Sequence, residues 1–293
     1  MRIVIAGASG LIGTELTRQL TARGDEVVRL VRGQTAGPGE ASWDPASDRL
    51  DPAVLANTDA VVNLAGAPIS SLPWTRARKA AILRSRVDAT TTIVHALAEA
   101  PVGVLVNGSA VGFYGSRPGE RLTESASAGD GFLAEVVQSW EAAALAAPPA
   151  TRVVLARTGV VVGNGGAIAP LRLLAKFGAA GPLGSGRQHW PWISLRDEAA
   201  ALVHLIDHEL SGPVNLSGPS PAAASDLIRA VARSLNRPYW LPAPAPLLTL
   251  ALGEAARELL LADQLQVPQA LLESGFRFRD ATVADAVAQL GLR

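Results

Sequence analysis

The glycine-rich turn GASGLIG, at residues 7–13, is the feature that most constrains how this chain can fold. The β-branched run RIVIAG leads into it, as a buried parallel strand does. Apolar residues at helical spacing follow over residues 11–24, and a second β-branched run covers residues 26–32. A strand, a helix and a strand within about thirty residues form a βαβ unit. The chain therefore begins with the building block of a parallel α/β sheet.

The spacing of three glycines in this turn suits a bound dinucleotide. Gly7 permits the tight turn, Gly10 lets the backbone approach a pyrophosphate, and Gly13 lets the helix pack closely against the sheet. An ordinary glycine-rich loop is the alternative, but the strand–turn–helix–strand context is the one that the dinucleotide fingerprint requires. We therefore expect the cofactor to contact Gly7, Ser9, Gly10, Leu11, Ile12 and Gly13.

Strands and helices keep alternating after this first unit. β-Branched runs predict strands at residues 59–66, 102–109 and 151–163. Helical patterns lie between them, at residues 74–100 and 131–146. This alternation predicts an α/β fold with a Rossmann-type, doubly wound, mostly parallel sheet.

The texture of the sequence changes after residue 163, where glycine, proline and tryptophan become frequent. One more strand is expected at residues 212–218, and helices and proline-rich turns follow it. We expect an NAD(P)-binding Rossmann domain over residues 1–163, with a returning segment near residues 190–218. A smaller, mostly helical substrate-binding domain is expected over residues 164–293.

Composition excludes several classes of function. Lys plus Arg and Asp plus Glu each number 26, so no net charge draws the chain to nucleic acid or to an anionic membrane. The chain has no cysteine, which excludes disulfides, thiol catalysis and cysteine-ligated metals and fits the cytoplasm. We expect neither a signal peptide nor a membrane span, because the apolar runs are too short. The expected partner is a small-molecule substrate, and the oligomeric state stays open.

The residue at the end of the second strand selects between the two nicotinamide cofactors. An acidic residue there accepts a hydrogen bond from the ribose 2′-hydroxyl of NAD, whereas an arginine holds the 2′-phosphate of NADP. This chain has Arg32 at that strand end and no Asp or Glu. We therefore expect NADP, with NADPH preferred over NADH. A solvated strand-end arginine is the alternative.

Motifs along almost the whole chain resemble those of one superfamily. They include GASGLIG, VVNLAGAPI, SRVDATTTIV, LVNGSAVGFYG, DGFLAEVVQSWEAAA, RTGVVVGNGGA and GPLGSGRQHWPWISLRDEAAA. The chain resembles the extended short-chain dehydrogenase/reductases, which include nucleotide-sugar epimerases and dehydratases. More narrowly, it resembles their atypical branch of epimerase family proteins. The resemblance implies a Rossmann domain, a nicotinamide cofactor and a substrate domain built largely from the C-terminal part.

The active site of this superfamily combines a Ser or Thr at the end of the fifth strand with Tyr-x-x-x-Lys on the next helix. Ser109 matches the first of these, so the resemblance implies a hydrogen bond to a ligand and makes Ser109 a candidate catalytic residue. When the helix is aligned on Glu141, the Tyr and Lys positions fall at Leu133 and Val137. Neither side chain ionises, so the usual acid and its charge partner are absent.

Tyr114 lies in the turn before that helix and is the candidate replacement acid. It would serve if its loop folded over the nicotinamide. The alternative is a turn tyrosine with a packed ring and a solvated hydroxyl.

Three residues at the end of the expected strand at 59–66 and one on the following helix complete the cofactor site that the resemblance implies. They are Leu64, Ala65, Gly66 and Arg86. Many extended members carry Asn near the position of Arg86. An arginine there would reach a cofactor phosphate or an anionic substrate, and a place on the helix surface is the alternative.

The loop GSGRQHWPWI, at residues 184–193, is the candidate substrate loop. Substrate contacts are expected from Arg187, Gln188, His189 and Trp190. Trp190 and Trp192 would offer a stacking surface. A structural turn anchored by the tryptophans is the alternative.

His204 and His208 stand four residues apart on an expected helix, as zinc ligands do. Leu205 follows the first histidine, where a metalloprotease motif has Glu. We therefore expect no metal site.

Two functions from different classes remain. The first is an NADP-dependent oxidoreductase or epimerase that acts on a small polar carbonyl or sugar-like substrate. Proton transfer would then need Tyr114, His189, water or the substrate itself. The second is a non-catalytic NADP-binding sensor or partner-binding module, which the missing Tyr and Lys favour.

Overall fold

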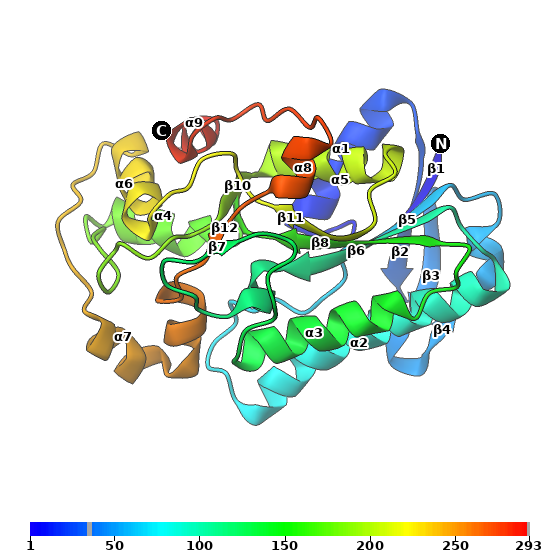
Figure 1. Ribbon diagram of the computed structural model, residues 1–293, viewed down its shortest axis with the longest axis horizontal. Helices are drawn as coiled ribbons and strands as arrows, with labels where there is room; N and C mark the ends of the chain where they lie inside the picture. Colours follow the sequence, from blue (N-terminus) through cyan, green and yellow to red (C-terminus); the bar gives the residue numbers. More distant parts are fainter. Residues whose placement is uncertain (34–36, 292–293) are drawn as a thin grey trace.

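An eight-stranded sheet forms the centre of the protein (Figure 1). The computed structural model describes residues 1–33 and 37–291. The strand order is β11-β8-β6-β5-β1-β2-β3-β4, and every neighbouring pair is parallel except β3 and β4. The strands are β1 (Arg2–Ala6), β2 (Glu26–Arg32), β3 (Glu40–Asp44), β4 (Arg49–Leu50), β5 (Ala60–Asn63), β6 (Val104–Ala110), β8 (Arg152–Thr158) and β11 (Gly212–Leu216). The predicted α/β, Rossmann-type sheet is confirmed.

Helices cover both faces of this sheet (Figure 1). One face carries α1 (Leu11–Arg23) and α5 (Leu195–Asp207), and the other carries α2 (Arg76–Glu99) and α3 (Phe132–Leu145). Successive side chains of a strand point to opposite faces. In β1, Ile3 and Ile5 therefore enter the core under α1 and α5, whereas Val4 enters the core under α2. The sheet is buried on both sides, which explains its continuous apolar strands.

The predicted strand at 151–163 is two strands. β8 ends at Thr158, and β9 (Val160–Val162) leaves the central sheet to pair with β10 (Trp192–Ser194). The break falls at Gly159, where a Cβ atom would lie 2.1 Å from the carbonyl oxygen of Pro191. Only glycine lets the two chain segments approach so closely.

The C-terminal part forms a second core. It contains α4 (Ile168–Lys176), α6 (Ala224–Ser234), α7 (Ala245–Leu252) and α9 (Val283–Ala288). The buried side chains of Trp190 and Trp192 belong to this core. No helix in the described part of the chain is both long and apolar enough to cross a membrane.

Short elements connect this second core to the sheet. They are the 3₁₀ turn Val111–Tyr114, β7 (Arg121–Leu122), the π-helical turn Ala256–Leu260, β12 (Leu265–Gln266) and α8 (Gln269–Glu273). β12 pairs with β7, and Leu271 of α8 packs into the sheet core. The Asp197 carboxylate of α5 accepts hydrogen bonds from the backbone N–H groups of Arg279 and Asp280, at 3.0–3.2 Å. The chain therefore returns to the Rossmann part before it ends.

Candidate functional site

The glycine-rich turn has the geometry of a phosphate cradle. Gly7 has a φ of 79°, and a Cβ atom on it would lie 2.6 Å from the Leu64 carbonyl oxygen. A Cβ atom on Gly13 would lie 2.3 Å from the Gly7 carbonyl oxygen. Gly10 is exposed, and its Cβ would meet only the Gly7 carbonyl oxygen, at 3.3 Å. Gly7 and Gly13 are thus required by the fold, whereas Gly10 leaves an open space at the start of α1.

The other residues expected around a cofactor lie at the same edge of the sheet. Ser9 is exposed, and the side chains of Leu11, Ile12, Leu64 and Ala65 are half-buried. This arrangement fits a dinucleotide, because the open space and the backbone N–H groups at the start of a helix suit a pyrophosphate.

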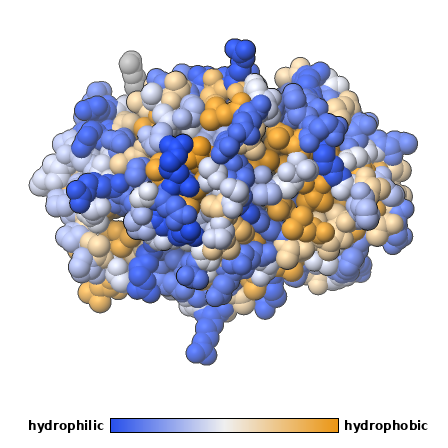
Figure 2. All heavy atoms as spheres, in the orientation of Figure 1, coloured by the Kyte–Doolittle hydropathy of each residue, from blue (hydrophilic) through white to orange (hydrophobic). Residues whose placement is uncertain are grey.

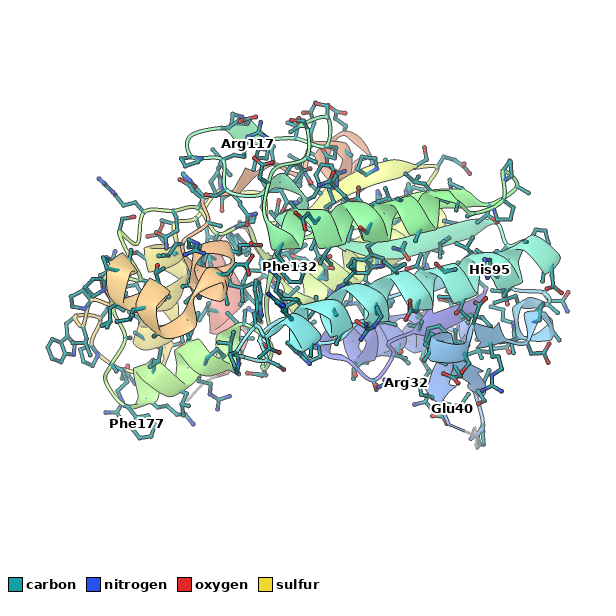
Figure 3. The ribbon with its side chains drawn as sticks, turned by 90° about the horizontal axis from the view of Figure 1, so that it is seen from below. Arg32, Glu40, His95, Arg117, Phe132 and Phe177 are labelled. Carbon is teal, nitrogen blue, oxygen red and sulfur yellow. The ribbon has the colours of Figure 1, made fainter. Side chains whose placement is uncertain are left out.

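Arg32 ends β2 with an exposed side chain (Figure 3). The carboxylate of Glu40 does not neutralise it, since Glu40 pairs with Arg29 at 3.0 Å. Among the described residues, no carboxylate forms an ion pair with the guanidinium of Arg32.

Ser109 lies at the end of β6 and belongs to a buried ionic cluster. Its hydroxyl donates to Glu141 of α3, with 2.6 Å between Oγ and Oε1. Arg157 of β8 holds both oxygens of the same carboxylate, at 2.8 and 2.9 Å. An ionised carboxylate only accepts hydrogen bonds, so Ser109 must be the donor. Its Oγ can then accept a hydrogen bond from a ligand but has no proton left to offer a carbonyl oxygen.

Tyr114 is fully buried, with no exposed surface. Its hydroxyl donates to Asn215 Oδ1 at 2.7 Å and accepts from Arg157 Nη1 at 3.0 Å. Burial raises the pKa of this hydroxyl. The expectation of a solvated hydroxyl is wrong, because strand β11 brings Asn215 to it. The hydroxyl is committed to the protein and faces no open space in which a substrate could reach it.

Apolar contacts occupy the positions where the superfamily carries Tyr and Lys. A Cβ atom on Gly112 would lie 3.2 Å from Leu133 Cβ and 3.7 Å from Val137 Cγ2. The start of α3 is held from the C-terminal part, because the Glu258 carboxylate accepts from the N–H groups of Phe132 and Leu133 at 2.9 and 2.7 Å.

The candidate substrate loop is built differently from the expectation. Gln188 is buried and donates from Nε2 to the carbonyls of Leu183 and Leu260, at 3.0 and 2.8 Å. Trp190 is 6% exposed and Trp192 is 1% exposed, so neither offers a stacking surface. Both rings fill the C-terminal core, as the alternative of a tryptophan-anchored turn predicts.

Two of the four residues expected to contact the substrate remain accessible. Arg187 is exposed, and His189 is half-buried. His189 Nδ1 lies 2.8 Å from Asp263 Oδ1, and the His189 N–H donates to the same oxygen at 2.9 Å. The neighbouring Gln264 donates to the carbonyls of Val111 and Gly115, in the turn that follows Ser109, at 3.1 and 2.9 Å. The His189–Asp263 pair is thus tied to the turn beside β6.

Sequence reasoning missed the polar groups that organise this region. They are Glu141, Arg157, Asn215, Asp263 and Gln266. A signal for two of them was present, because Arg157 interrupts the apolar strand RVVLART and Glu141 lies in the apolar helix FLAEVVQSWEAAAL. Charges in buried elements require partners.

His204 and His208 stack with 3.7 Å between their ring centres, and His204 Nε2 lies 2.8 Å from Ser274 Oγ. Among the residues that the structure describes, no three potential ligands come together as a metal site.

Comparison with known proteins places the chain. The model of the NAD dependent epimerase/dehydratase family matches residues 3–217. The chain belongs to this family. The model of a domain of unknown function, DUF1731, matches residues 243–290.

Epimerase family proteins from distant organisms match over nearly the whole chain. One from Mycobacterium tuberculosis is 43% identical over 288 residues, which is 97% of this chain and 96% of the relative. SDR39U1 from Homo sapiens is 33% identical over 299 residues, 99% of each. The crystal structure of human SDR39U1 (isoform 2) with NADPH has a TM-score of 0.90 at 32% identity and 99% coverage of both chains. UDP-glucose 4-epimerase from Thermus thermophilus with NAD has a TM-score of 0.75 over 100% of this chain and 98% of that chain, at 18% identity, and shares the fold.

Proposed function

We propose that the chain is an NADP-binding protein of the oxidoreductase and epimerase type, with NADPH preferred over NADH. The observation that carries this proposal is Arg32, an exposed guanidinium at the end of β2 whose neighbour Glu40 is engaged by Arg29. An arginine at this position suits the 2′-phosphate of NADP, whereas the 2′-hydroxyl of NAD is usually bound by an acidic residue. The NADPH in the crystal structure of human SDR39U1 supports the proposal.

In this proposal the open space at Gly10 receives the pyrophosphate. Leu64, Ala65 and Gly66 line the cofactor where β5 ends, and Arg86 stands beside them. The nicotinamide half extends toward Ser109, at the end of β6. A bound nicotinamide would supply a hydride donor or acceptor. The chain would bind, orient and shield it.

We further propose that the substrate is a small polar carbonyl or sugar-like molecule, turned over slowly. Ser109 accepts a hydrogen bond from it, because its own proton goes to Glu141. The phenol of Tyr114 is sequestered by Asn215. His189 is the imidazole of the loop and is half-buried, and its Nδ1 lies 2.8 Å from Asp263 Oδ1. It is the candidate proton donor or acceptor.

The test of cofactor preference is calorimetric titration with NADPH and with NADH. We expect NADPH to bind more tightly, and we expect Arg32→Asp to weaken NADPH by about tenfold or more with little effect on NADH. Arg49→Asp is the matched control for a lost surface charge. Arg49 is an exposed arginine of β4 that pairs with Asp44 at the end of β3. Equal affinities of the wild-type protein for the two cofactors would overturn the preference.

A non-catalytic NADP sensor is the second candidate, favoured by the apolar Leu133 and Val137 in place of Tyr and Lys. NADPH oxidation with a panel of carbonyl compounds separates the two. If turnover is found, Tyr114→Phe should change its rate by less than about tenfold, because the buried hydroxyl does not reach the substrate. His189→Asn should lower the rate by about a hundredfold or more, as loss of general acid–base catalysis does. If the protein binds the cofactor but turns over none of these compounds, the result supports the non-catalytic sensor.

A further inference from the structure

Two arginines of α2 converge on the turn that follows β5. Arg78 donates to the carbonyl oxygen of Pro68, and Arg86 donates to the carbonyl oxygen of Ala67 at 3.1 Å. Arg86 also donates to Ile82 of its own helix at 3.0 Å. Two like charges therefore meet at one short stretch of backbone.

Neither guanidinium forms an ion pair with a described residue. The Nε atom of Arg78 is buried and makes no hydrogen bond within the described part of the chain. Burial and the charge of Arg78 lower the pKa of Arg86 to about 10, which still leaves it charged at neutral pH. Uncompensated charge is costly away from water, so an anion would relieve the pair.

The pair stands beside the glycine-rich turn. A Cβ atom on the exposed Gly66 would lie 3.1 Å from Arg86 Cζ. The same turn touches the phosphate cradle, because a Cβ on Gly7 would lie 2.6 Å from the Leu64 carbonyl oxygen. On the other side, Arg86 Cζ lies 5.2 Å from the centre of the Trp140 ring of α3. The guanidinium thus lies between the cradle and α3, beside an opening to solvent.

We propose that Arg78 and Arg86 form an oxyanion site that takes a phosphate group. The proposal rests on the proposed cofactor binding and names a further group that the same site holds. The phosphate is either the nicotinamide-side half of the pyrophosphate, whose adenosine-side half lies at Gly10, or the phosphate of a phosphorylated substrate. In either case α2 supplies the positive charge that Val137 does not supply from α3.

The experiment uses Arg86→Gln and Arg78→Gln, because glutamine keeps a donor for the backbone carbonyls and removes the charge. Arg84→Gln is the matched control, since Arg84 is exposed on the same helix. Circular dichroism and the melting temperature verify that each variant folds. Calorimetry then measures the affinity for NADPH, for adenosine 2′,5′-bisphosphate, and for inorganic phosphate added to free and to NADPH-loaded protein.

Each outcome decides the proposal. If the cofactor supplies the phosphate, Arg86→Gln weakens NADPH by about tenfold or more while adenosine 2′,5′-bisphosphate changes less than about threefold. If the substrate supplies it, NADPH affinity is unchanged, and phosphate binding to the loaded wild-type protein is lost in both variants. Affinities equal to those of Arg84→Gln throughout overturn the proposal. A wild-type protein that binds no NADPH refutes the proposed function instead, and phosphate titration of the free protein then decides this site.

Discussion

Glu198 of α5 is a carboxyl group with no exposed surface. Its Oε1 accepts from Thr158 Oγ1 at 2.8 Å, and its Oε2 has no hydrogen-bond partner among the described residues. Burial raises the pKa of Glu198 from 4.5 to about 8, and the hydrogen bond from Thr158 opposes this only in part. The group is therefore neutral in the folded protein at pH 7.

The pH dependence of stability should reveal this group. Between its unfolded pKa and about 8, the folded state holds a proton that the unfolded state has lost. Stability therefore falls as pH rises through this window. Glu198→Gln mimics the neutral acid and removes the effect, so we expect it to stabilise the protein by up to about 4 kcal/mol at pH 8 and little at pH 5.

Urea unfolding of the wild-type protein and Glu198→Gln at both pH values measures this difference. Glu209→Gln is the control, because the Glu209 side chain is fully exposed. A Glu198→Gln effect that is the same at pH 5 and pH 8 would show that Glu198 is ionised in the folded state.

For single residues, the sequence predicts where the backbone turns or packs closely better than it predicts which side chains form hydrogen bonds. The turn at Gly7 and the close approach at Gly13 follow from local spacing. The partner of Ser109 is 32 residues away, and the partner of Tyr114 is 101 residues away. Local patterns carry no information on such pairs, so the sequence could not show that both hydroxyl groups are committed to the protein.

Helix α3 depends on the C-terminal part for its N-terminal cap. Gly131 precedes it with a φ of 109° and offers no side-chain acceptor, so Glu258 supplies one from the π-helical turn. A carboxylate at a helix N-terminus accepts hydrogen bonds from free N–H groups and interacts favourably with the positive end of the helix dipole. Figure 3 shows Phe132 at this helix start, beside α2.

Removal of this cap should cost stability. We expect Glu258→Ala to lower the free energy of unfolding by about 1–2 kcal/mol, the usual effect of a lost helix cap. Denaturant unfolding measures it, with Glu209→Ala as the surface control. A stability equal to that of the control would mean that the two hydrogen bonds do not hold the helix in solution.

The helices expected over residues 11–24, 74–100 and 131–146 match α1, α2 and α3 to within two residues, because their signals are local. The predicted end at Gly24 is confirmed, with a φ of 93° and N–H bonds to Leu20 and Thr21. The split at Gly159 was not predicted, since it depends on Pro191, which lies far along the chain. β12 and β7 were missed because each strand is only two residues long and leaves no periodic pattern in the sequence.

Across the whole molecule, the segment that contains β12 links the second core to the central sheet. Gln266 of β12 donates to the carbonyl of Arg157 and to Asn215 Oδ1, both at 2.8 Å. The face in Figure 2 interleaves polar and apolar residues. The sequence predicts a Rossmann part and a C-terminal part. The hydrogen bonds of Gln266 join residues far apart in the chain, so only the structure reveals them.

Cofactor binding should therefore stabilise the molecule as a unit. A ligand at a hundred times its Kd adds about 2.7 kcal/mol to the free energy of unfolding, which raises the melting temperature of a chain of this size by about 5 °C. We expect one transition that shifts as NADPH is added. Scanning calorimetry measures it.

Gly10→Val is the control for this shift. The Gly10 φ of −75° suits any residue, and its Cβ would meet only one atom, so the variant should fold. Its side chain would fill the space of the pyrophosphate, and NADPH should then cause no shift. A shift of wild-type size in Gly10→Val would place the cofactor elsewhere.

The packing of Leu133 and Val137 against Gly112 holds the start of α3 close to the turn that carries Tyr114. A tyrosine and a lysine placed at these two positions would have to keep or displace this contact with Gly112. They would also meet Ser109 with its proton already given to Glu141. Two substitutions at these positions would therefore not by themselves supply the usual acid and its charge partner, because the contacts of Gly112 and Ser109 would stay as they are.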